Sequence, residues 1–246
     1  MNKSAADRLT ERFDGRLVVV TGAGRAGQVG EAVAREFARR GASVALIDRD
    51  EAAVEELASA LRRESLDISA YACDLTDAAA TAAVAHRIEG NGPGRAYALA
   101  NVAGGFAMSG PIADSDPALF QHQLAINLGS AYGATRAFLP AVRASRGAVV
   151  FMASAAILPG GRTEGMSAYA AAKGGVVALM RCVAQEERVH GVRANAVAPT
   201  AVRTSQNLAS MGHAFPYVER EAVAVMIAFL CSRAAENVSG QVVELA

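Results

Sequence analysis

Short apolar runs alternate with longer amphipathic stretches along the whole chain. The runs are rich in Val, Ile, Leu and Ala and show no polar face, which is typical of strands that are buried on both sides of a sheet. Seven such runs are predicted to be strands, at residues 16–21, 43–47, 68–73, 97–101, 147–153, 193–198 and 241–245.

The stretches between these runs carry apolar residues at helical spacing. They predict helices at residues 31–40, 51–63, 76–89, 117–142, 167–190 and 219–232. Gly41 is expected to end the first helix, and Thr76 is expected to cap the third. Strands that alternate with helices predict an α/β fold, in which a parallel sheet of seven strands is covered by helices on both faces. No repeat, low-complexity tract or linker divides the chain, so residues 1–246 are expected to form a single domain, with residues 1–14 as an N-terminal extension.

Composition narrows the functional classes. The chain is 52% hydrophobic and has a formal net charge of zero, so a nucleic-acid backbone or an anionic membrane surface is not an expected partner. The polar start of the chain has no apolar core of a signal peptide, and no apolar run approaches the roughly 20 residues of a membrane span. Cys73, Cys182 and Cys231 lack metal-ligand spacing and are expected to be buried thiols in a reducing compartment. We therefore expect a cytoplasmic protein without a bound metal.

Tyr169 and Lys173 are the first candidates for chemistry. Residues four apart on a helix share one face, and an ammonium group beside a phenol favours the phenolate. The pair can therefore provide a proton donor and acceptor near neutral pH. The alternative is an amphipathic helix with a half-buried tyrosine and a solvated lysine. Only two of the 24 basic residues are lysines, Lys3 and Lys173, and this rarity favours a specific role for Lys173.

A glycine-rich turn follows the first strand and opens the first helix. It contains Gly22, Gly24, Gly27 and Gly30. Such a turn lets the backbone approach a diphosphate at the N-terminus of the helix. Asp48 ends the second strand, where a carboxylate can bind the ribose hydroxyls of an adenosine. Asp48 would repel a 2′-phosphate and so favours NAD over NADP.

Arg25 and Arg49 argue the other way, because either guanidinium could bind a 2′-phosphate. NADP is therefore kept as the alternative cofactor.

Taken together, these motifs resemble the classical short-chain dehydrogenase/reductase family. The resemblance covers about residues 15–245, and its motifs are Thr21-Gly22, Asp74, Asn101-Val-Ala-Gly104, Asn127, Ser154, Tyr169 with Lys173, and Asn195-Ala-Val-Ala-Pro199. It implies a Rossmann-type doubly wound sheet and hydride transfer between NAD(H) and a secondary alcohol or ketone.

The resemblance also implies roles for individual residues. Tyr169 would exchange a proton with the substrate oxygen, and Lys173 would bind the nicotinamide ribose and lower the tyrosine pKa. Ser154 would polarise the substrate oxygen, and Asn127 would anchor a water in a proton relay. The cofactor-binding residues would be Gly22, Gly24, Arg25, Gly27, Val29, Gly30, Asp48, Arg49, Asp74, Leu75, Asn101, Ala103, Gly104, Tyr169, Lys173, Pro199, Val202 and Thr204.

The chain departs from the family pattern at four places. The glycine turn is two residues longer, and the stretch from Ser154 to Tyr169 is about two residues longer. Thr200 replaces the usual glycine after Pro199, and the segment that would cover the substrate, between Thr204 and Glu219, is about a dozen residues shorter. Two alternatives stay open for this reason: an NADPH-dependent 3-oxoacyl reductase and a non-catalytic protein that binds the cofactor.

Two further expectations concern the ligand and the assembly. The apolar residues expected to face the substrate are Phe106, Met108, Ile157, Met166, Met211, Phe215 and Tyr217. Family members commonly pair through their two long helices, so the resemblance implies a homodimer or homotetramer.

Overall fold

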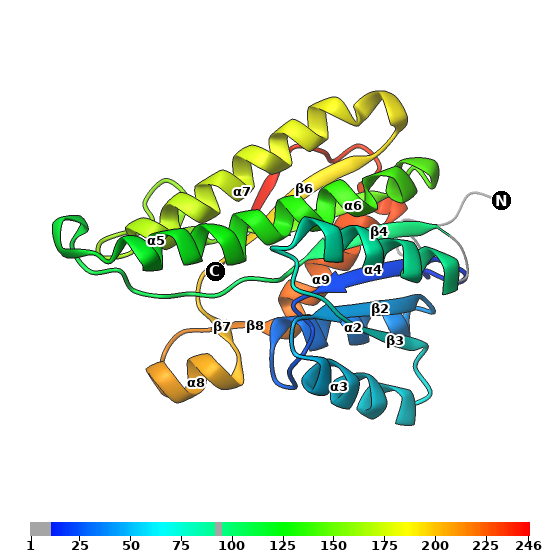
Figure 1. Cartoon of the computed structure of the whole chain (residues 1–246), viewed down its shortest axis with the longest axis horizontal. Coiled ribbons are helices and arrows are strands. Elements are labelled where there is room, and N and C mark those ends of the chain that lie inside the picture. Colours follow the sequence, from blue (N-terminus) through cyan, green and yellow to red (C-terminus); the bar gives the residue numbers. More distant parts are fainter. Residues whose placement is uncertain (1–10, 92–94) are drawn as a thin grey trace.

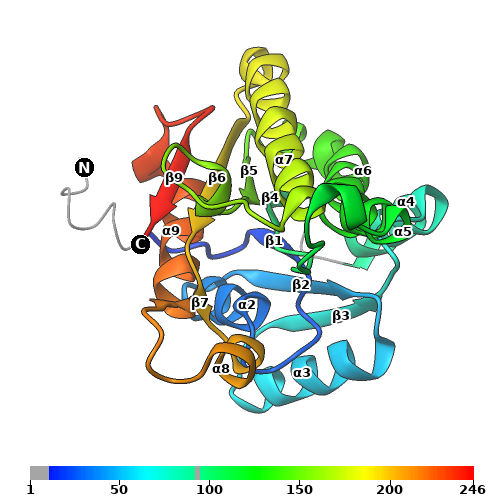
Figure 2. The same ribbon diagram turned by 90° about the vertical axis from the view of Figure 1, so that its left-hand side faces the viewer.

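The computed structural model describes residues 11–91 and 95–246, so most of the expected N-terminal extension lies outside the described residues. Its centre is a sheet of seven parallel strands (Figure 1), and their order, β3-β2-β1-β4-β5-β6-β9, can be followed in Figure 2. The strands are β1 (Leu17–Thr21), β2 (Ser43–Asp48), β3 (Ile68–Ala72), β4 (Ala96–Asn101), β5 (Ala148–Met152), β6 (Arg193–Pro199) and β9 (Val242–Leu245). The predicted α/β architecture, with all seven strands, is confirmed.

Helices cover both faces of this sheet (Figure 2). The helices of the chain are α2 (Val29–Arg39), α3 (Glu51–Arg63), α4 (Ala78–Asn91), α5 (Pro117–Gln123), α6 (Ser130–Ala144), α7 (Ser167–Glu186), α8 (Ser205–Met211) and α9 (Arg220–Cys231), of which α8 lies outside the two helical layers. The core consists of two apolar layers, one on each face of the sheet. Val18 and Val20 of β1 pack with α2, α3 and α9, whereas Leu17 and Val19 pack with α4, α6 and α7. Because side chains alternate along a strand, one apolar run supplies both layers.

All the predicted helices but 51–63 differ from their predicted bounds, among them the last long helix, α7, which ends at Glu186 rather than at residue 190, and two of the differences have a local cause. The third predicted helix begins at Ala78 rather than at residue 76, and its cap is Asp77, whose carboxylate accepts the backbone N–H groups of Ala79 (2.8 Å) and Ala80 (3.0 Å). Thr76 instead donates its hydroxyl to Asp74 at 2.7 Å. The long predicted helix at 117–142 is divided by a π-helical segment, Leu124–Gly129.

The segment after Pro199 contains structure that the sequence pattern did not predict. Two short parallel strands, β7 (Val202–Arg203) and β8 (Val218–Glu219), pair with each other and enclose helix α8. Strands of two residues are too short to show a hydrophobic period. We call residues 204–217 the lid.

The part of the expected N-terminal extension that the structure describes belongs to the core. The Phe13 ring is fully buried and packs edge-on against Phe37, with ring centroids 5.0 Å apart. Cys73 and Cys231 are buried as expected, but Cys182 is exposed on α7, so the prediction that it is a core thiol is wrong. A helix position is buried only if it faces the sheet, and Cys182 lies on the solvent side.

The sheet topology places a binding crevice. The strands β1, β2 and β3 follow one another towards one edge of the sheet, whereas β4, β5 and β6 follow one another towards the other edge, so the strand order reverses between β1 and β4. In open parallel sheets, ligands bind at the carboxyl ends of the strands that flank such a reversal. The glycine turn after β1 and the loop after β4 meet at this point.

Candidate active site

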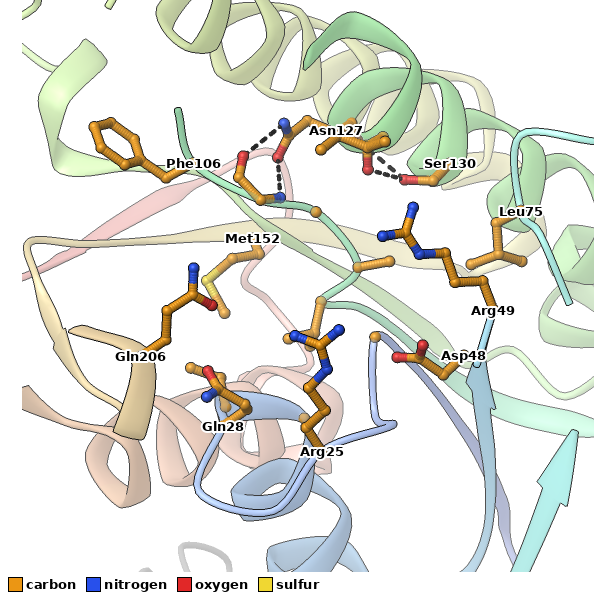
Figure 3. Close-up of a pocket in the computed structure, with 18 of the residues that line it drawn as sticks. Arg25, Gln28, Asp48, Arg49, Leu75, Phe106, Asn127, Ser130, Met152 and Gln206 are labelled. Atoms are coloured by element: carbon orange, nitrogen blue, oxygen red, sulfur yellow. Dashed lines mark hydrogen bonds between the residues drawn. The ribbon is translucent and has the colours of Figure 1, made fainter. Parts of the chain in front are cut away.

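A cavity of about 520 Å³ lies at this edge of the sheet (Figure 3). This volume is within the range of small-molecule and cofactor sites. Its walls come from the glycine turn, the ends of β2, β3, β4 and β5, the π-helical segment, α7 and the start of the lid. Segments far apart in the sequence therefore converge on one site.

Thr21 joins the glycine turn to the loop after β4. Its hydroxyl oxygen accepts the backbone N–H groups of Val102 and Ala103, both at 3.1 Å. The threonine at the end of β1 therefore keeps the two walls of the cavity at a fixed separation.

Gly24 is required by the position of Asp48. A Cβ atom at Gly24 would lie 2.5 Å from the Asp48 carboxyl carbon, closer than any real contact. The Asp48 carboxylate also accepts the backbone N–H of Asp50 at 3.2 Å. The second glycine of the turn thus gives room to the acid at the end of β2.

Two arginines extend into the same end of the cavity. Arg25 from the glycine turn and Arg49 beside Asp48 are both exposed there, and both guanidinium groups point inward (Figure 3). Asp74 lies across from them. Hydrogen bonds from Thr76 are the main cause that lowers the pKa of Asp74, and the positive charge of Arg49 adds to it. This end therefore presents two carboxylates and two guanidinium groups.

Tyr169 lies at the other end of the cavity, in the first turn of α7. Its half-buried ring meets the ring of Phe106 edge-on, with centroids 5.1 Å apart. The Tyr169 hydroxyl shares a hydrogen bond with Ser154, which lies at the end of β5. The Ser154 oxygen also accepts the backbone N–H of Ala156 at 3.3 Å, which fixes the orientation of the serine.

Lys173 is buried one turn further along α7. Only 4% of the residue is exposed, so the alternative of a solvated lysine does not hold. Its ammonium group donates to the backbone carbonyl of Met152 at 2.8 Å and lies 5.7 Å from the centre of the Tyr169 ring. Burial lowers the pKa of Lys173 to about 8.

The expected effect of Lys173 on the pKa of Tyr169 is not observed. Burial raises the pKa of the Tyr169 phenol, and the hydrogen bond with Ser154 opposes that rise only in part. Desolvation disfavours the phenolate, and the Lys173 ammonium is directed at the carbonyl of Met152. In this structure the tyrosine is therefore held in its neutral form.

Asn127 lies in the π-helical segment and holds the loop after β4. Its amide donates to the Gly105 carbonyl at 3.0 Å, and its oxygen accepts the Gly105 N–H at 3.2 Å (Figure 3). The amide also donates to the Gln123 side chain at 3.2 Å. The side chain is thus fully engaged with protein groups.

Most of the predicted site residues line this one cavity. They are Gly22, Arg25, Val29, Gly30, Asp48, Arg49, Asp74, Leu75, Ala103, Gly104, Asn127, Tyr169, Lys173, Pro199, Val202 and Thr204. Gly24, Gly27, Asn101 and Ser154 do not contribute to its wall. Asn101 is buried and donates to the Thr135 hydroxyl at 3.0 Å, so its side chain points into the sheet layer rather than the cavity.

Some residues of the wall were not predicted. Gln28, His122, Met152, Gln206 and Asn207 also line the cavity. Gln206 and Asn207 directly follow Thr204, so their place in the chain could have indicated them. Of the seven apolar residues that we expected at the substrate, only Phe106 lines the cavity.

The residues present fit a dinucleotide cofactor. Gly104 has a φ of 152°, and a Cβ atom there would lie 2.4 Å from the Asn127 amide oxygen and 3.5 Å from the Lys173 ammonium. Only glycine at this position lets Asn127 and Lys173 pack this closely against the loop beside Tyr169. The charged groups at one end of the cavity suit the adenosine end of such a cofactor, and Tyr169 at the other end suits its nicotinamide end. Among the described residues, no cluster of His, Cys, Asp or Glu is arranged to hold a metal ion, and no helix is long and apolar enough to cross a membrane.

Comparisons with known proteins agree on one family. Residues 16–212 match the family described as short chain dehydrogenase. Galactitol 2-dehydrogenase of Rhizobium johnstonii is 35% identical over 78% of this chain and 74% of its own length. Meso-2,3-butanediol dehydrogenase of Serratia marcescens is 31% identical over 93% of this chain and 92% of its own. A crystal structure of a gluconate 5-dehydrogenase from Burkholderia cenocepacia, in complex with NADP and tartrate, has a TM-score of 0.89 at 25% identity and covers 98% of this chain and 97% of its own.

Proposed function

Because this chain belongs to the short-chain dehydrogenase family, we propose that it is an NAD(H)-dependent oxidoreductase that acts on a secondary alcohol or ketone. The observation that carries the proposal is the position of Tyr169. Its hydroxyl meets Ser154, and the buried Lys173 lies one helical turn away on the same cavity. Asp48 and the glycine turn form the opposite end of that cavity.

The residues of the chain divide the proton chemistry among them. The neutral Tyr169 phenol donates its proton to the oxygen of a ketone and becomes a phenolate, and in the reverse direction the phenolate takes the proton of an alcohol and returns to the neutral phenol. Ser154 holds the same oxygen through its hydroxyl, and Lys173 provides a buried positive charge that favours the phenolate once it forms. A bound nicotinamide cofactor supplies or accepts the hydride. The glycine turn, in which Gly22 packs against the Ala103 backbone and Gly30 against the Gly22 carbonyl, would hold its diphosphate at the N-terminus of α2, and Asp48 would bind its adenosine ribose.

The substrate class rests on the relatives and on the wall beside Tyr169. The names of the related enzymes specify galactitol and 2,3-butanediol, both alcohols. Phe106, which is 54% exposed, and Met152 offer apolar contact beside polar groups from Gln206 and Asn207. This mixture suits a small polyol or diol.

The choice between NAD and NADP depends on three side chains. The Asp48 carboxylate accepts hydrogen bonds from ribose hydroxyl groups and repels a 2′-phosphate, which supports NAD. Arg25 and Arg49 are exposed in the same end of the cavity, which is the observation in favour of NADP and of a reductase. We favour NAD because Asp48 packs against Gly24 and accepts the backbone N–H of Asp50, whereas both arginines are exposed.

A fluorescence titration with NADH and NADPH tests this choice. We expect the wild-type protein to bind NADH at least tenfold more tightly than NADPH. Asp48→Ala should weaken NADH binding by about tenfold and strengthen NADPH binding, because two charge-assisted hydrogen bonds to the ribose are lost and a repulsion is removed. Arg49→Ala is the matched control and should affect NADPH alone.

If the wild type binds NADPH more tightly than NADH, the protein is assigned as an NADPH-dependent reductase instead. If the protein binds a cofactor tightly but turns over neither 2,3-butanediol nor galactitol, nor any of a panel of secondary alcohols and ketones, it is a non-catalytic cofactor-binding member of the family. Turnover of any of these compounds excludes that alternative.

We also propose that the chain forms a homodimer or homotetramer through α5, α6 and α7. An apolar groove on these helices is lined by Leu124, Leu128, Tyr132 and Leu179, and Tyr132 is 55% exposed. Small exposed residues of α7, such as Ala171, would let a second helix approach closely. Light scattering should give a mass of two or four chains, and Tyr132→Glu should reduce it to one chain. A monomeric wild type would contradict this proposal.

A further inference from the structure

The enlarged glycine turn touches the lid at Gly27. This residue has a φ of 77°, and a Cβ atom there would lie 1.9 Å from the hydroxyl oxygen of Ser205. Ser205, the first residue of α8, donates its backbone N–H to the Gly27 carbonyl at 3.1 Å. The glycine turn is therefore in direct contact with the start of the lid.

The other side of Gly27 is held by Glu31. The Glu31 carboxylate accepts the Gly27 N–H at 2.7 Å, although the residue is only 7% exposed. Two arginines neutralise it, Arg35 at 3.0 Å and Arg220 at 3.4 Å. Arg220 begins α9, just after the lid. The start of the lid therefore binds Gly27 directly, and the chain just after the lid is linked to Gly27 through Glu31 of α2.

The lid between these attachments is internally bonded. The Thr204 hydroxyl caps α8 by accepting the Asn207 N–H at 3.2 Å, and the Asn207 side chain donates to the Val202 carbonyl at 2.8 Å. The Tyr217 hydroxyl donates to the carbonyl of Gly212 at 2.7 Å, which closes the far side. A segment with these bonds moves as one piece, and it carries Gln206 and Asn207 into the cavity.

We propose that the Glu31 carboxylate and the backbone N–H of residue 205 position the lid against the glycine turn, so that the turn and the lid bind the cofactor as one unit. The inference rests on the proposed function, because it assigns the turn to a cofactor diphosphate. Charge alone predicts the opposite effect for Glu31. A carboxylate at the N-terminus of α2 competes with a diphosphate for the same positive end of the helix, so its removal would strengthen cofactor binding.

Two variants, each titrated with NADH, separate these explanations. Glu31→Ala leaves the Gly27 N–H without its acceptor, and Ser205→Pro removes the N–H that binds the Gly27 carbonyl. Proline is well tolerated at the first position of a helix, and the extended backbone of Thr204, with φ −114° and ψ 158°, is compatible with a following proline. We expect each variant to weaken NADH binding by about tenfold, the loss of roughly one positioning hydrogen bond.

Hydrogen exchange of the α8 amides gives a second readout. We expect NADH to slow this exchange in the wild type and to have at most half that effect in Ser205→Pro. A loss of general stability would not remove the response of the lid to the cofactor.

Matched variants control for structural damage. Glu187→Ala removes a carboxylate that is 3% exposed and binds Arg143 through two hydrogen bonds, at 2.6 and 2.8 Å, away from the cavity. It should cost comparable stability and leave the NADH affinity within twofold of the wild type. Ser205→Ala keeps the backbone N–H and should retain both the affinity and the lid protection.

Each outcome has a defined meaning. The inference is overturned if Glu31→Ala binds NADH as tightly as the wild type or more tightly, or if NADH protects the lid of Ser205→Pro as it does in the wild type. A wild type that binds neither NADH nor NADPH overturns the proposed function itself, and this inference with it. The two failures are therefore distinguishable.

Discussion

Replacement of Tyr169 by phenylalanine is expected to lower kcat on a secondary alcohol by roughly 10³-fold, at unchanged affinity for NADH. The ring is retained, with its edge-on contact to Phe106, while the hydroxyl that exchanges the proton beside Ser154 is lost. Steady-state kinetics with the best secondary alcohol substrate, combined with an NADH titration, measure both quantities.

Tyr71→Phe is the matched control for this change. Tyr71 is 8% exposed, belongs to β3 and does not line the cavity, so its loss of a hydroxyl should leave kcat unchanged. If Tyr169→Phe has a kcat close to that of the wild type, Tyr169 is not the acid and base of the reaction.

Lys173→Met is expected to give a protein that is more stable at neutral pH and nearly inactive. Burial lowers the pKa of Lys173 from its ordinary value of 10.5 to about 8, so the folded protein at pH 7 holds a charged group at a cost of roughly 3 kcal/mol. Loss of the hydrogen bond to the Met152 carbonyl offsets part of this gain, which leaves a net stabilisation of about 1–2 kcal/mol. The value of kcat should fall by at least about 10²-fold, because no positive charge remains to favour the phenolate.

The pH dependence of stability gives the sign of this effect. Between pH 8 and 10.5 the unfolded chain keeps the proton on Lys173 while the folded protein releases it, so the contribution of Lys173 to stability becomes more favourable as pH rises. The advantage of Lys173→Met in urea unfolding should therefore be largest at pH 7 and shrink towards pH 10. Lys173→Arg keeps its positive charge at every pH and should not be more stable than the wild type at pH 7. An equal or lower stability of Lys173→Met at pH 7 would show that the ammonium is not destabilising in the folded protein.

The sheet and its large helices could be predicted because buried parallel strands and amphipathic helices leave different hydrophobic periods. The glycine turn, Asp48 and the Tyr169–Lys173 pair could be found for a related reason, since each follows a strand or lies on one helical face. Residue order alone was sufficient for these features.

Other features depend on three-dimensional contacts that no period encodes. Burial raises the pKa of Tyr169, and only the structure shows that the Lys173 ammonium points at a carbonyl. The lid contains strands of two residues and a helix of seven, too short for a pattern. Asp77 rather than Thr76 caps the helix because the helix begins one residue later than residue 77, and a hydrophobic period does not locate a helix start to one residue.

The π-helical segment at Leu124–Gly129 has a consequence for the effect of insertions and deletions. His122, Ile126 and Ser130 are spaced four apart and all line the cavity. In an uninterrupted α-helix this spacing would drift around the axis by about 40° per step, because each residue turns the helix by about 100°. The wider turn compensates for that drift and keeps the three residues in one row. The number of residues in this segment therefore decides which side chains line this wall of the cavity. Deletion of a single residue from an exposed turn of α5 would place different side chains in the wall, as a substitution within the cavity does.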